Sequence, residues 1–528
     1  MTSVEAFDSS RNGRTNDSLT ETSHFDGNGT NGNVNSSLSS KSKTSELPDP
    51  WPAPDAEGRL NATVVIPGSK SLSNRYLILA ALGHKPVTIA GMLRSRDTEL
   101  MAGALRTLGV GVEFDPDEET RVTVTPPADG RFNGDVTVFC GLAGTVMRFV
   151  PGLALFADGP VRFDGDEQAY ARPMHPLLDG LEQLGAHVEY EGKTGFLPFT
   201  ITPPQVQSDG EQRDGGDRGF GVSNGSADSS AAEIAKVEID SSSSSQFISS
   251  LLLIGSRLPA GLDLRHTGAK LPSMPHIRMT MADVNGAGGN AEMPEIGHWQ
   301  VAHLALQLPD GVVVEPDLSN AAPFLGAAMI AGGAVSVPNW PTSTTQPGGL
   351  LPDILQKMGA TVTLNGRAFD DVMANARNPQ KAAFVPRNGT LTVSMDGPIC
   401  GLGKAFDMSA AGEIAPSIAA LATLADSPSE LVGIGHLRGH ETNRLAALVT
   451  EITRIGAGAK ELPDGLAITP VLHDRLHGEI METYADHRMA TFAAMIGLAV
   501  PNTRIRNIAT TRKTIPDFPG MWRKMLES

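Results

Sequence analysis

A repeated turn constrains the fold of this chain more than any other feature. Residues 105–112 (LRTLGVGV) end an apolar helical pattern with glycine and continue as an alternating, strand-like run. The pattern returns at 181–188 (LEQLGAHV), 355–362 (LQKMGATV) and 452–459 (ITRIGAGA), with a degenerate copy at 283–289. Glycine takes the left-handed backbone that ends a helix, and alternation is typical of a half-buried strand. Copies some 75 to 100 residues apart are too long for solenoid units, so we expect several small α/β units in two domains.

Three polar stretches interrupt this pattern. Residues 1–54, 203–232 and 366–388 are rich in Ser, Gly, Asn and Asp and poor in large apolar groups. Such composition cannot bury enough surface to offset chain entropy. We expect a disordered tail, a disordered insertion at 203–232 and a polar insertion of similar character at 366–388.

The overall charge and the cysteine content exclude several classes of protein. A net charge of −17 argues against nucleic-acid binding, which needs a basic face. Two cysteines, Cys140 and Cys400, form neither a disulfide framework nor a zinc cluster. No signal-peptide core and no apolar run of about 18 residues is found, so we expect a cytoplasmic protein without a membrane partner, and a monomer.

The stretch 67–75 (PGSKSLSNR) predicts an anion site. A β-branched run ends at Pro67-Gly68, and Leu72, Tyr76 and Leu79 then recur at helical spacing. Lys70 and Ser71 thereby lie at a helix start, where free N–H groups favour an anion. Arg75 lies four residues after Ser71, so the two share a helical face. A capped turn with a solvated lysine is the alternative for this stretch alone.

Further turns carry cations in the same way. Arginines or lysines occur at or next to a predicted helix start or turn in GLAGTVMR (141–148), ARPMHPL (171–177), HETNR (440–444), DHRMA (486–490) and TTRKTIPDF (510–518). A serine run, 241–245, precedes Gln246 and an apolar helix, although serine runs are more often linkers. Each motif alone also fits an ordinary turn or surface ion pair. Together, in an acidic chain, they indicate one site for several anionic groups.

In this order, the motifs resemble those of the enolpyruvyl transferases, specifically the EPSP synthase (3-phosphoshikimate 1-carboxyvinyltransferase) family. The resemblance covers nearly everything from residue 58 onward. It implies an α/β fold of two similar lobes, each of three βαβαββ units, arranged as an inside-out α/β barrel. The implied boundaries are 68–312 for the N-terminal lobe, and 55–67 with 313–528 for the C-terminal lobe.

The resemblance implies transfer of the enolpyruvyl group of phosphoenolpyruvate to the 5-hydroxyl of shikimate 3-phosphate. The reaction passes through a tetrahedral intermediate and uses no metal or organic cofactor. Glu413, Glu441 and Lys70 are the implied catalytic residues. The implied contacts of shikimate 3-phosphate are Lys70, Ser71, Arg75, Ser244, Ser245, Gln246, Ser273, Glu413 and His440; those of phosphoenolpyruvate are Lys70, Gly144, Arg172, Gln246, Arg444, Arg488 and Lys513.

The chain departs from the family pattern near Glu441. His440 stands where lysine is usual, and Glu413 lies where an aspartate is usual. A nearby phosphate favours charged imidazole, so we expect activity to fall above the pKa of His440. A UDP-N-acetylglucosamine enolpyruvyl transferase is the nearest rival, but no cysteine lies between Arg148 and Arg172 as that group requires. A non-catalytic anion-binding homologue would have lost at least one of these charges.

Overall fold

The computed structural model describes residues 47–204, 233–270 and 273–528. Residues Pro48–Ser528 form one compact unit. The predicted insertion at 203–232 and most of the predicted tail lie outside the described residues. No helix in the described part is long and apolar enough to span a membrane.

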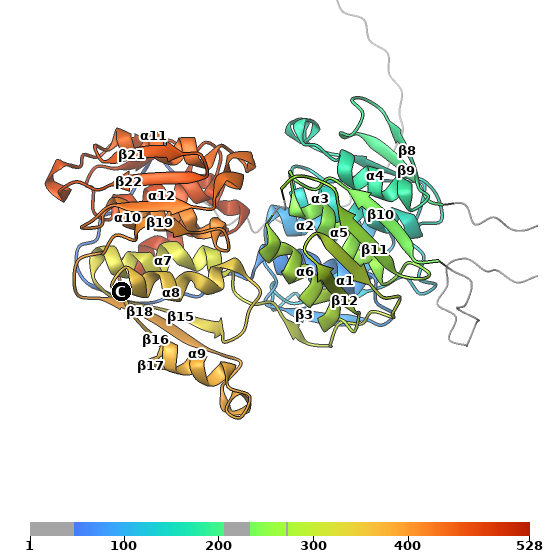
Figure 1. The fold of residues 1–528 in the computed structure, drawn as a ribbon, viewed down its shortest axis with the longest axis horizontal. Coiled ribbons are helices and arrows are strands. Elements are labelled where there is room, and N and C mark those ends of the chain that lie inside the picture. The colour runs from blue at the N-terminus through green and yellow to red at the C-terminus, as the bar shows by residue number, and fades with distance from the viewer. Residues whose placement is uncertain (1–46, 205–232, 271–272) are drawn as a thin grey trace, which may run out of the picture. The chain divides into compact units, whose positions relative to one another are not determined.

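Small sheets of one recurring topology build the molecule (Figure 1). In one of them β6 pairs in parallel with β7, and β9 then joins β7 and β8 in antiparallel fashion. The sheets β10-β11-β13-β12 and β19-β20-β22-β21 have the same order and the same pairing. A helix follows each of the first two strands, which gives a βαβαββ unit. The predicted fold class is confirmed.

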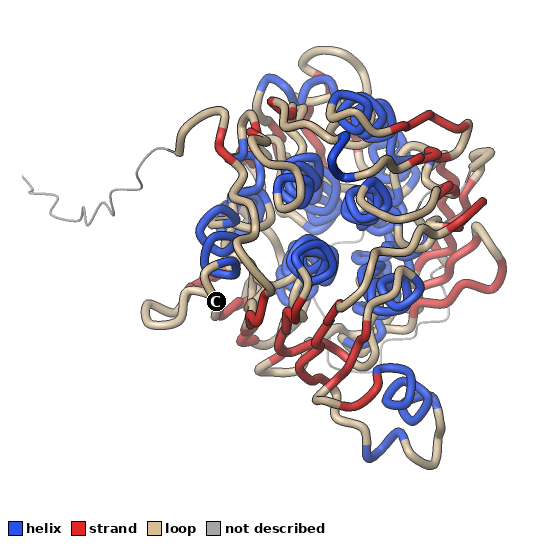
Figure 2. The backbone as a smooth tube through the Cα atoms, turned by 90° about the vertical axis from the view of Figure 1, so that its left-hand side faces the viewer, coloured by secondary structure: helices blue, strands red, loops and turns tan. Residues whose placement is uncertain are grey.

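Helices form the interior, as the end-on view in Figure 2 shows. Every residue of α12 (His487–Gly497) is buried, and so are most of those in α7 (Leu318–Ala331). Many strands, in contrast, alternate buried with partly exposed residues. Such a helix must be apolar on all sides except at its ends, so its polar residues gather where it begins.

The repeated glycines end their helices as the sequence predicts. All five have positive φ, between 86° and 101°. In each copy the N–H of the following residue donates to a carbonyl five residues back, as Val110 does to Leu105 at 3.0 Å. This left-handed cap, which is closed by two backbone hydrogen bonds, ends the helix and directs the chain into the following strand. The glycines are Gly109, Gly185, Gly288, Gly359 and Gly456.

Two short strands, β2 and β14, each pair with a strand that lies far away in the chain. Strand β2 (Leu60–Thr63) pairs in parallel with β15 (Gly333–Pro341), while β14 (Val312–Val313) pairs with β3 (Val87–Ala90). The connecting segments hydrogen-bond to each other: Ser69 N–H donates to Glu315 O at 2.8 Å, and Asp317 N–H to Pro67 O at 2.9 Å. The domain boundaries near Pro67 and Val313 stay a prediction.

Two predicted polar stretches are partly ordered. Trp51, inside the predicted tail 1–54, is buried in β1 (Trp51–Pro52) and pairs with β24. The insertion 366–388 contains α9 (Phe369–Arg377), so the expectation of disorder there is wrong. Phe369 and Val372 lie three positions apart and are buried, which is enough to fix a short helix against β16.

The strands are β1 (Trp51–Pro52), β2 (Leu60–Thr63), β3 (Val87–Ala90), β4 (Gly111–Phe114), β5 (Val122–Thr125), β6 (Val136–Phe139), β7 (Val161–Asp164), β8 (His187–Tyr190), β9 (Phe199–Thr202), β10 (Ala235–Ile239), β11 (Leu262–His266), β12 (Ala291–Glu295), β13 (His298–Val301), β14 (Val312–Val313), β15 (Gly333–Pro341), β16 (Thr361–Leu364), β17 (Arg367–Ala368), β18 (Asn388–Met395), β19 (Gly403–Asp407), β20 (Ser429–Val432), β21 (Gly458–Leu462), β22 (Gly465–Thr469), β23 (Ile480–Met481) and β24 (Arg504–Ile505).

The α-helices are α1 (Lys70–Ala81), α2 (Arg96–Thr107), α3 (Gly144–Phe149), α4 (His175–Gln183), α5 (Ser245–Gly255), α6 (Met274–Gly286), α7 (Leu318–Ala331), α8 (Leu351–Lys357), α9 (Phe369–Arg377), α10 (Ala415–Thr423), α11 (Arg444–Arg454), α12 (His487–Gly497) and α13 (Phe518–Leu526). Short 3₁₀ turns connect several of them, such as Gly412–Ile414 before α10 and Ile508–Lys513 before α13.

Candidate active site

Lys70 is the first residue of α1, directly after the turn at Gly68. Its ammonium nitrogen lies 3.2 Å from Oδ2 of Asp97, which belongs to the first turn of α2. The Lys70 side chain is only 18% exposed. The structure therefore contradicts the alternative of a solvated lysine, because this ammonium group is held against a carboxylate.

Arg75 lies behind Ser71 and is buried. Its Nη1 donates to the Ser71 carbonyl at 2.9 Å and its Nε donates to Thr280 Oγ1 at 2.8 Å. Burial lowers the pKa of Arg75 to about 10, and the Asp283 carboxylate partly opposes this shift. Arg75 thus joins α1 to α6 through protein acceptors and supports the backbone that presents Ser71.

Two guanidinium groups converge on Gly144. A Cβ at this position would lie 3.0 Å from Arg172 Nη2 and 3.2 Å from Arg148 Nη1. Arg172 donates to the Leu142 carbonyl at 3.1 Å. Burial, and then the like charge of Arg172, lower the pKa of Arg148 to about 9. A side chain here would require both guanidinium groups to shift by a few tenths of an ångström, so glycine lets them lie close to the backbone.

The serine run ends in a helix cap. Ser244 precedes α5, and its side chain accepts a hydrogen bond from the N–H of Gln246 at 3.2 Å. Ser245 is buried, and Gln246 is partly exposed in the first turn. The linker alternative for these two serines is therefore wrong, since both are ordered at a helix start.

Ser273 precedes α6 and bonds to a residue that the sequence does not single out. Its Oγ lies 2.8 Å from Nδ1 of His276. Burial lowers the pKa of His276 to about 4, and the nearby carboxylate of Glu413 opposes that shift. His276 therefore connects Ser273 with Glu413 electrostatically, and no motif around it could have indicated this.

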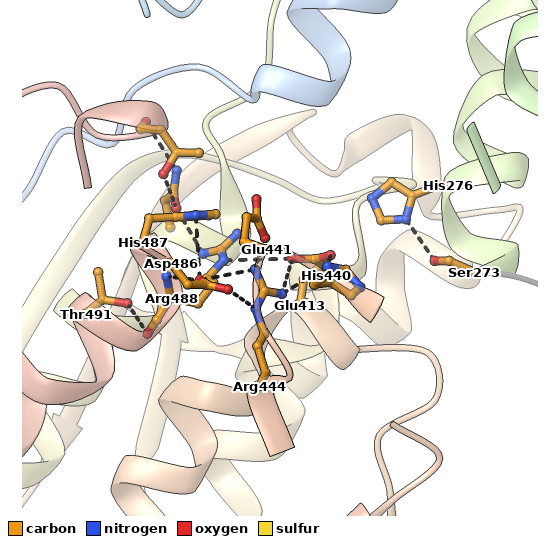
Figure 3. A network of polar contacts seen from close by, with 12 residues as sticks. Ser273, His276, Glu413, His440, Glu441, Arg444, Asp486, His487, Arg488 and Thr491 are labelled. Carbon is orange, nitrogen blue, oxygen red and sulfur yellow. Dashed lines mark hydrogen bonds and ion pairs between the residues drawn. The ribbon is translucent and has the colours of Figure 1, made fainter. Parts of the chain in front are cut away.

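Arg444 is the centre of a cluster of polar side chains in the C-terminal half of the chain, the Arg444 cluster (Figure 3). Its side chain is 1% exposed and donates to Asp486 Oδ2 and to Glu441 Oε2, each at 2.8 Å. Its Nη1 lies 3.5 Å from Glu413 Oε2 and 3.3 Å from His440 Nδ1. One guanidinium group thus fixes three carboxylates. Such a buried cation is stable because each N–H has an anionic or polar acceptor.

Glu413 is surrounded by cations and histidines. Burial alone would raise its pKa, but His440, Arg444 and Arg488 hold it well below the usual range. His440 Nδ1 lies 3.8 Å from Glu413 Oε1, and the ring of His436 is 5.9 Å from that of His440. Glu413 is therefore a carboxylate at neutral pH.

Glu441 lies between two cations. Burial would raise its pKa, whereas Arg444 and Lys513 lower it well below the usual range. Lys513 forms an ion pair with Glu441 Oε1. Burial lowers the pKa of Lys513, and Lys70 lowers it further, so the two lysines are electrostatic neighbours.

Arg488 lies in the first turn of α12, next to a side-chain cap. Asp486 precedes the helix as its N-cap, and its side chain accepts from the Arg488 N–H at 2.8 Å. Nη1 of Arg488 donates to Asn320 Oδ1 at 2.9 Å. Its Nε has no hydrogen-bond partner among the described residues and lies 3.8 Å from Glu413. A buried guanidinium group with an unused N–H is ready to bind a further anion.

The predicted site residues form two groups that influence each other's charge. Burial lowers the pKa of Arg172, while Glu441 and Asp97 raise it. The Lys70–Lys513 and His276–Glu413 effects likewise connect the N-terminal motifs with the C-terminal ones. The sequence does not identify Asp97, His276, Asn320 or Asp486 as site residues, although the DHRMA motif contains the last of these.

One group of side chains has the spacing of metal ligands. Potential ligand atoms of Glu441, Asp486 and His487 lie within 4.8 Å of one another. The two carboxylates already accept hydrogen bonds from Arg444, and Glu441 also from Lys513. A divalent cation would have to displace these cations, so this donor set suits an ion-pair network better than a metal.

Comparison with solved structures defines the class of the fold. An EPSP synthase from Acinetobacter baumannii matches with a TM-score of 0.68 at 19% identity, covering 89% of this chain and 97% of that one. The enolpyruvyl transferase NikO from Streptomyces tendae matches with a TM-score of 0.59 at 17% identity, covering 89% and 96%. The fold is that of the enolpyruvyl transferases.

Sequence relatives narrow the class. The family model "EPSP synthase (3-phosphoshikimate 1-carboxyvinyltransferase)" matches residues 54–211 and 222–522, and the chain belongs to this family. A 3-phosphoshikimate 1-carboxyvinyltransferase from Bifidobacterium longum is 61% identical over 487 residues, which cover 92% of this chain and 99% of the relative. The enzyme of that name from Kocuria rhizophila is 44% identical over 491 residues, covering 91% and 97%.

Proposed function

We propose that this chain transfers the enolpyruvyl group of phosphoenolpyruvate to the 5-hydroxyl of shikimate 3-phosphate and releases phosphate. The family and its 61% identical relative support the reaction. One observation in the structure carries the assignment of the site. Arg444 holds Glu413 and Glu441 as ionised carboxylates, next to a pair of neighbouring lysines, Lys70 and Lys513.

Fixed cations overcome the repulsion between two anionic substrates. Arg172 has only the Leu142 carbonyl as an acceptor among the described residues, and Arg488 retains an unused Nε–H. We assign both to the phosphate and carboxylate of phosphoenolpyruvate, because planar guanidinium groups match both anions. Gly144 leaves the space beside Arg172 open.

Arg444 has a different role from the predicted direct contact. Its N–H groups already face Glu413, Glu441, Asp486 and His440. We therefore propose that Arg444 is a positioning residue that orients the two glutamates.

Glu413 is the base in this proposal. Its carboxylate accepts the proton of the 5-hydroxyl as the oxygen attacks C2 of phosphoenolpyruvate. The Lys513–Glu441 pair supplies the proton that C3 gains in the same step, because burial lowers the pKa of the ammonium group. The tetrahedral intermediate then loses phosphate from C2 while the proton on C3 returns to the Lys513–Glu441 pair, which restores the double bond. The proton on Glu413 passes to the departing phosphate.

On the shikimate side, Lys70, Ser71, Ser244, Ser245, Gln246, Ser273 and His440 remain the proposed contacts. Arg75 acts there by holding the Ser71 carbonyl.

The test measures phosphate release from phosphoenolpyruvate in the presence of shikimate 3-phosphate. We expect release to depend on both substrates. Release that depends on UDP-N-acetylglucosamine instead would overturn the proposal. We also propose a cytoplasmic monomer; size-exclusion chromatography with light scattering tests the oligomeric state.

A further inference from the structure

A cavity of about 650 Å³ lies beside the start of α6. Its walls are the loop after β15 (residues 341–350) and the segment with α9, together with the start of α6. None of the predicted site residues is among the described residues that line it. The volume falls in the range of pockets that bind small molecules.

Three exposed arginines line this open cavity: Arg278 of α6, Arg377 at the end of α9, and Arg387 just before β18. The lining contains no aspartate or glutamate. Within the described part of the chain, none of the three guanidinium groups has a carboxylate within ion-pair distance. In a chain with a net charge of −17, three such cations around one cavity create a local field that attracts anions.

The carboxylate of Glu315 lies next to this loop but does not line the cavity. Oε2 of Glu315 accepts from Thr344 Oγ1 at 2.6 Å and from Gln346 Nε2 at 2.8 Å. Both donors belong to the lining, so the Glu315 carboxylate is hydrogen-bonded to the loop and stabilises it.

The walls are held together at Arg387. Thr342 N–H donates to the Arg387 carbonyl at 2.9 Å, and Thr342 Oγ1 donates to the Pro386 carbonyl at 2.8 Å. The backbone that carries Arg387 is thereby fixed to the adjacent loop after β15. Phe369 and Met373 of α9 add an apolar surface.

We infer that this cavity binds a small organic anion. Its carboxylate or phosphate contacts Arg278, Arg377 and Arg387, and its apolar body packs against Phe369 and Met373. The described lining shares no residue with the proposed substrate contacts, although Pro275 adjoins Ser273, and the inference does not rest on the proposed function. Arg278 lies in α6 within two turns of Ser273 and His276, so the occupied cavity adjoins the helix that begins at the site.

Calorimetric titration of the full chain tests this inference. The probes are benzoate, benzyl phosphate and the neutral benzyl alcohol, each with and without saturating shikimate 3-phosphate. We expect one or both anions to bind, the alcohol not to bind, and shikimate 3-phosphate not to compete. Whether benzoate or benzyl phosphate binds more tightly distinguishes a carboxylate from a phosphate ligand.

The double variant Arg377→Ala/Arg387→Ala should weaken anion binding at least ~10-fold, since each charge-assisted hydrogen bond contributes that much. Lys381→Ala, an exposed cation of the same segment outside the lining, should bind as wild type does. Unchanged binding in the double variant, competition by shikimate 3-phosphate, or no binding of either anion at about 10 mM would overturn the inference. Phosphate release by the double variant should equal wild type, which separates this result from a failure of the proposed function.

Discussion

Glu413 is the residue on which the proposed chemistry depends most. Glu413→Gln keeps the shape but removes the carboxylate that accepts the hydroxyl proton, so kcat/KM should fall about 10² to 10⁴-fold. Steady-state phosphate release measures the effect, and thermal unfolding confirms that the variant is folded. Glu238→Gln, at an exposed position of β10, is the matched control. A variant that retains more than about a tenth of wild-type kcat/KM would remove Glu413 from the mechanism.

We expect His440 to make the activity depend on pH. Burial lowers its pKa, Glu413 raises it, and Arg444 lowers it further. The charged ring is therefore lost, as pH rises, below the ordinary value of about 6.5. If charged imidazole binds the substrate phosphate, kcat/KM should decline from that pH upward. His440→Lys should move the decline to higher pH, because lysine stays charged.

The pH–rate profile of kcat/KM shows whether the activity requires a charged side chain at position 440. His175→Asn changes an exposed histidine and should leave the profile as in wild type. An identical profile for His440→Lys would show that neutral imidazole suffices.

We expect Asp283 to make the stability of the protein depend on pH. Burial raises its pKa to about 7, while Arg75, 3.9 Å away, lowers it. Because the folded state binds this proton more tightly, the stability contribution is complete below the ordinary pKa near 3.8 and is lost as pH rises through about 7. The loss amounts to about 4 kcal/mol.

Asp283→Asn should remove this decline, because asparagine does not titrate. Urea unfolding at pH 4.5 and pH 7.5 measures the difference between wild type and variant. Equal pH dependence in both proteins would contradict the assignment.

Residue types were predictable and their contacts were not. Lys70, Arg172 and Arg488 were found at turns or helix starts because local spacing determines where a turn or a helix begins. Arg75 was expected to face the substrate from one helical face shared with Ser71. Its acceptors, Thr280 and Ser71 O, lie on two helices, so only tertiary packing shows that Arg75 is buried behind that face.

At the scale of the element, the turn at Gly68 requires glycine. A Cβ there would overlap the Gly91 carbonyl oxygen. In Gly68→Ala, the backbone at residue 68 and that at Gly91 must move apart. The variant should lose about 1 to 3 kcal/mol of unfolding free energy. Gly58→Ala is the control, because a Cβ at Gly58 would have no atom within 4 Å. Urea unfolding compares the two, and equal midpoints would contradict this reading of the turn.

The elements were predictable to the extent that their signals are local. The helix-ending glycines were found because a left-handed cap depends on one residue and its neighbours. Helix α9 was missed because its polar residues outnumber the two, Phe369 and Val372, that it buries. Trp51 was assigned to the tail because its partner strand β24 is about 450 residues away in the chain.

At the scale of the whole molecule, the class of fold followed from the order of the motifs, whereas the pairing of distant strands was expected only from the family resemblance. The exchange of β2 and β14 predicts how the chain behaves when it is divided after Asp310. The first fragment contains β2 without β15, and β3 without β14. We expect the two co-expressed fragments to copurify through a tag on one of them and to restore phosphate release.

Two fragments that each unfold cooperatively and do not copurify would show that the exchanged strands contribute little. Thermal unfolding of each purified fragment provides this comparison.

The exchanged strand also affects how the protein is made. Leu60 leaves the ribosome about 270 residues before its partner Gly333. At 5 to 20 residues per second, β2 waits roughly 15 to 55 s without the strand that completes its hydrogen bonds. During that time its unpaired edge is open to other nascent chains. A chaperone that shields the first synthesised segment should therefore raise the yield of this protein more than one that acts after release.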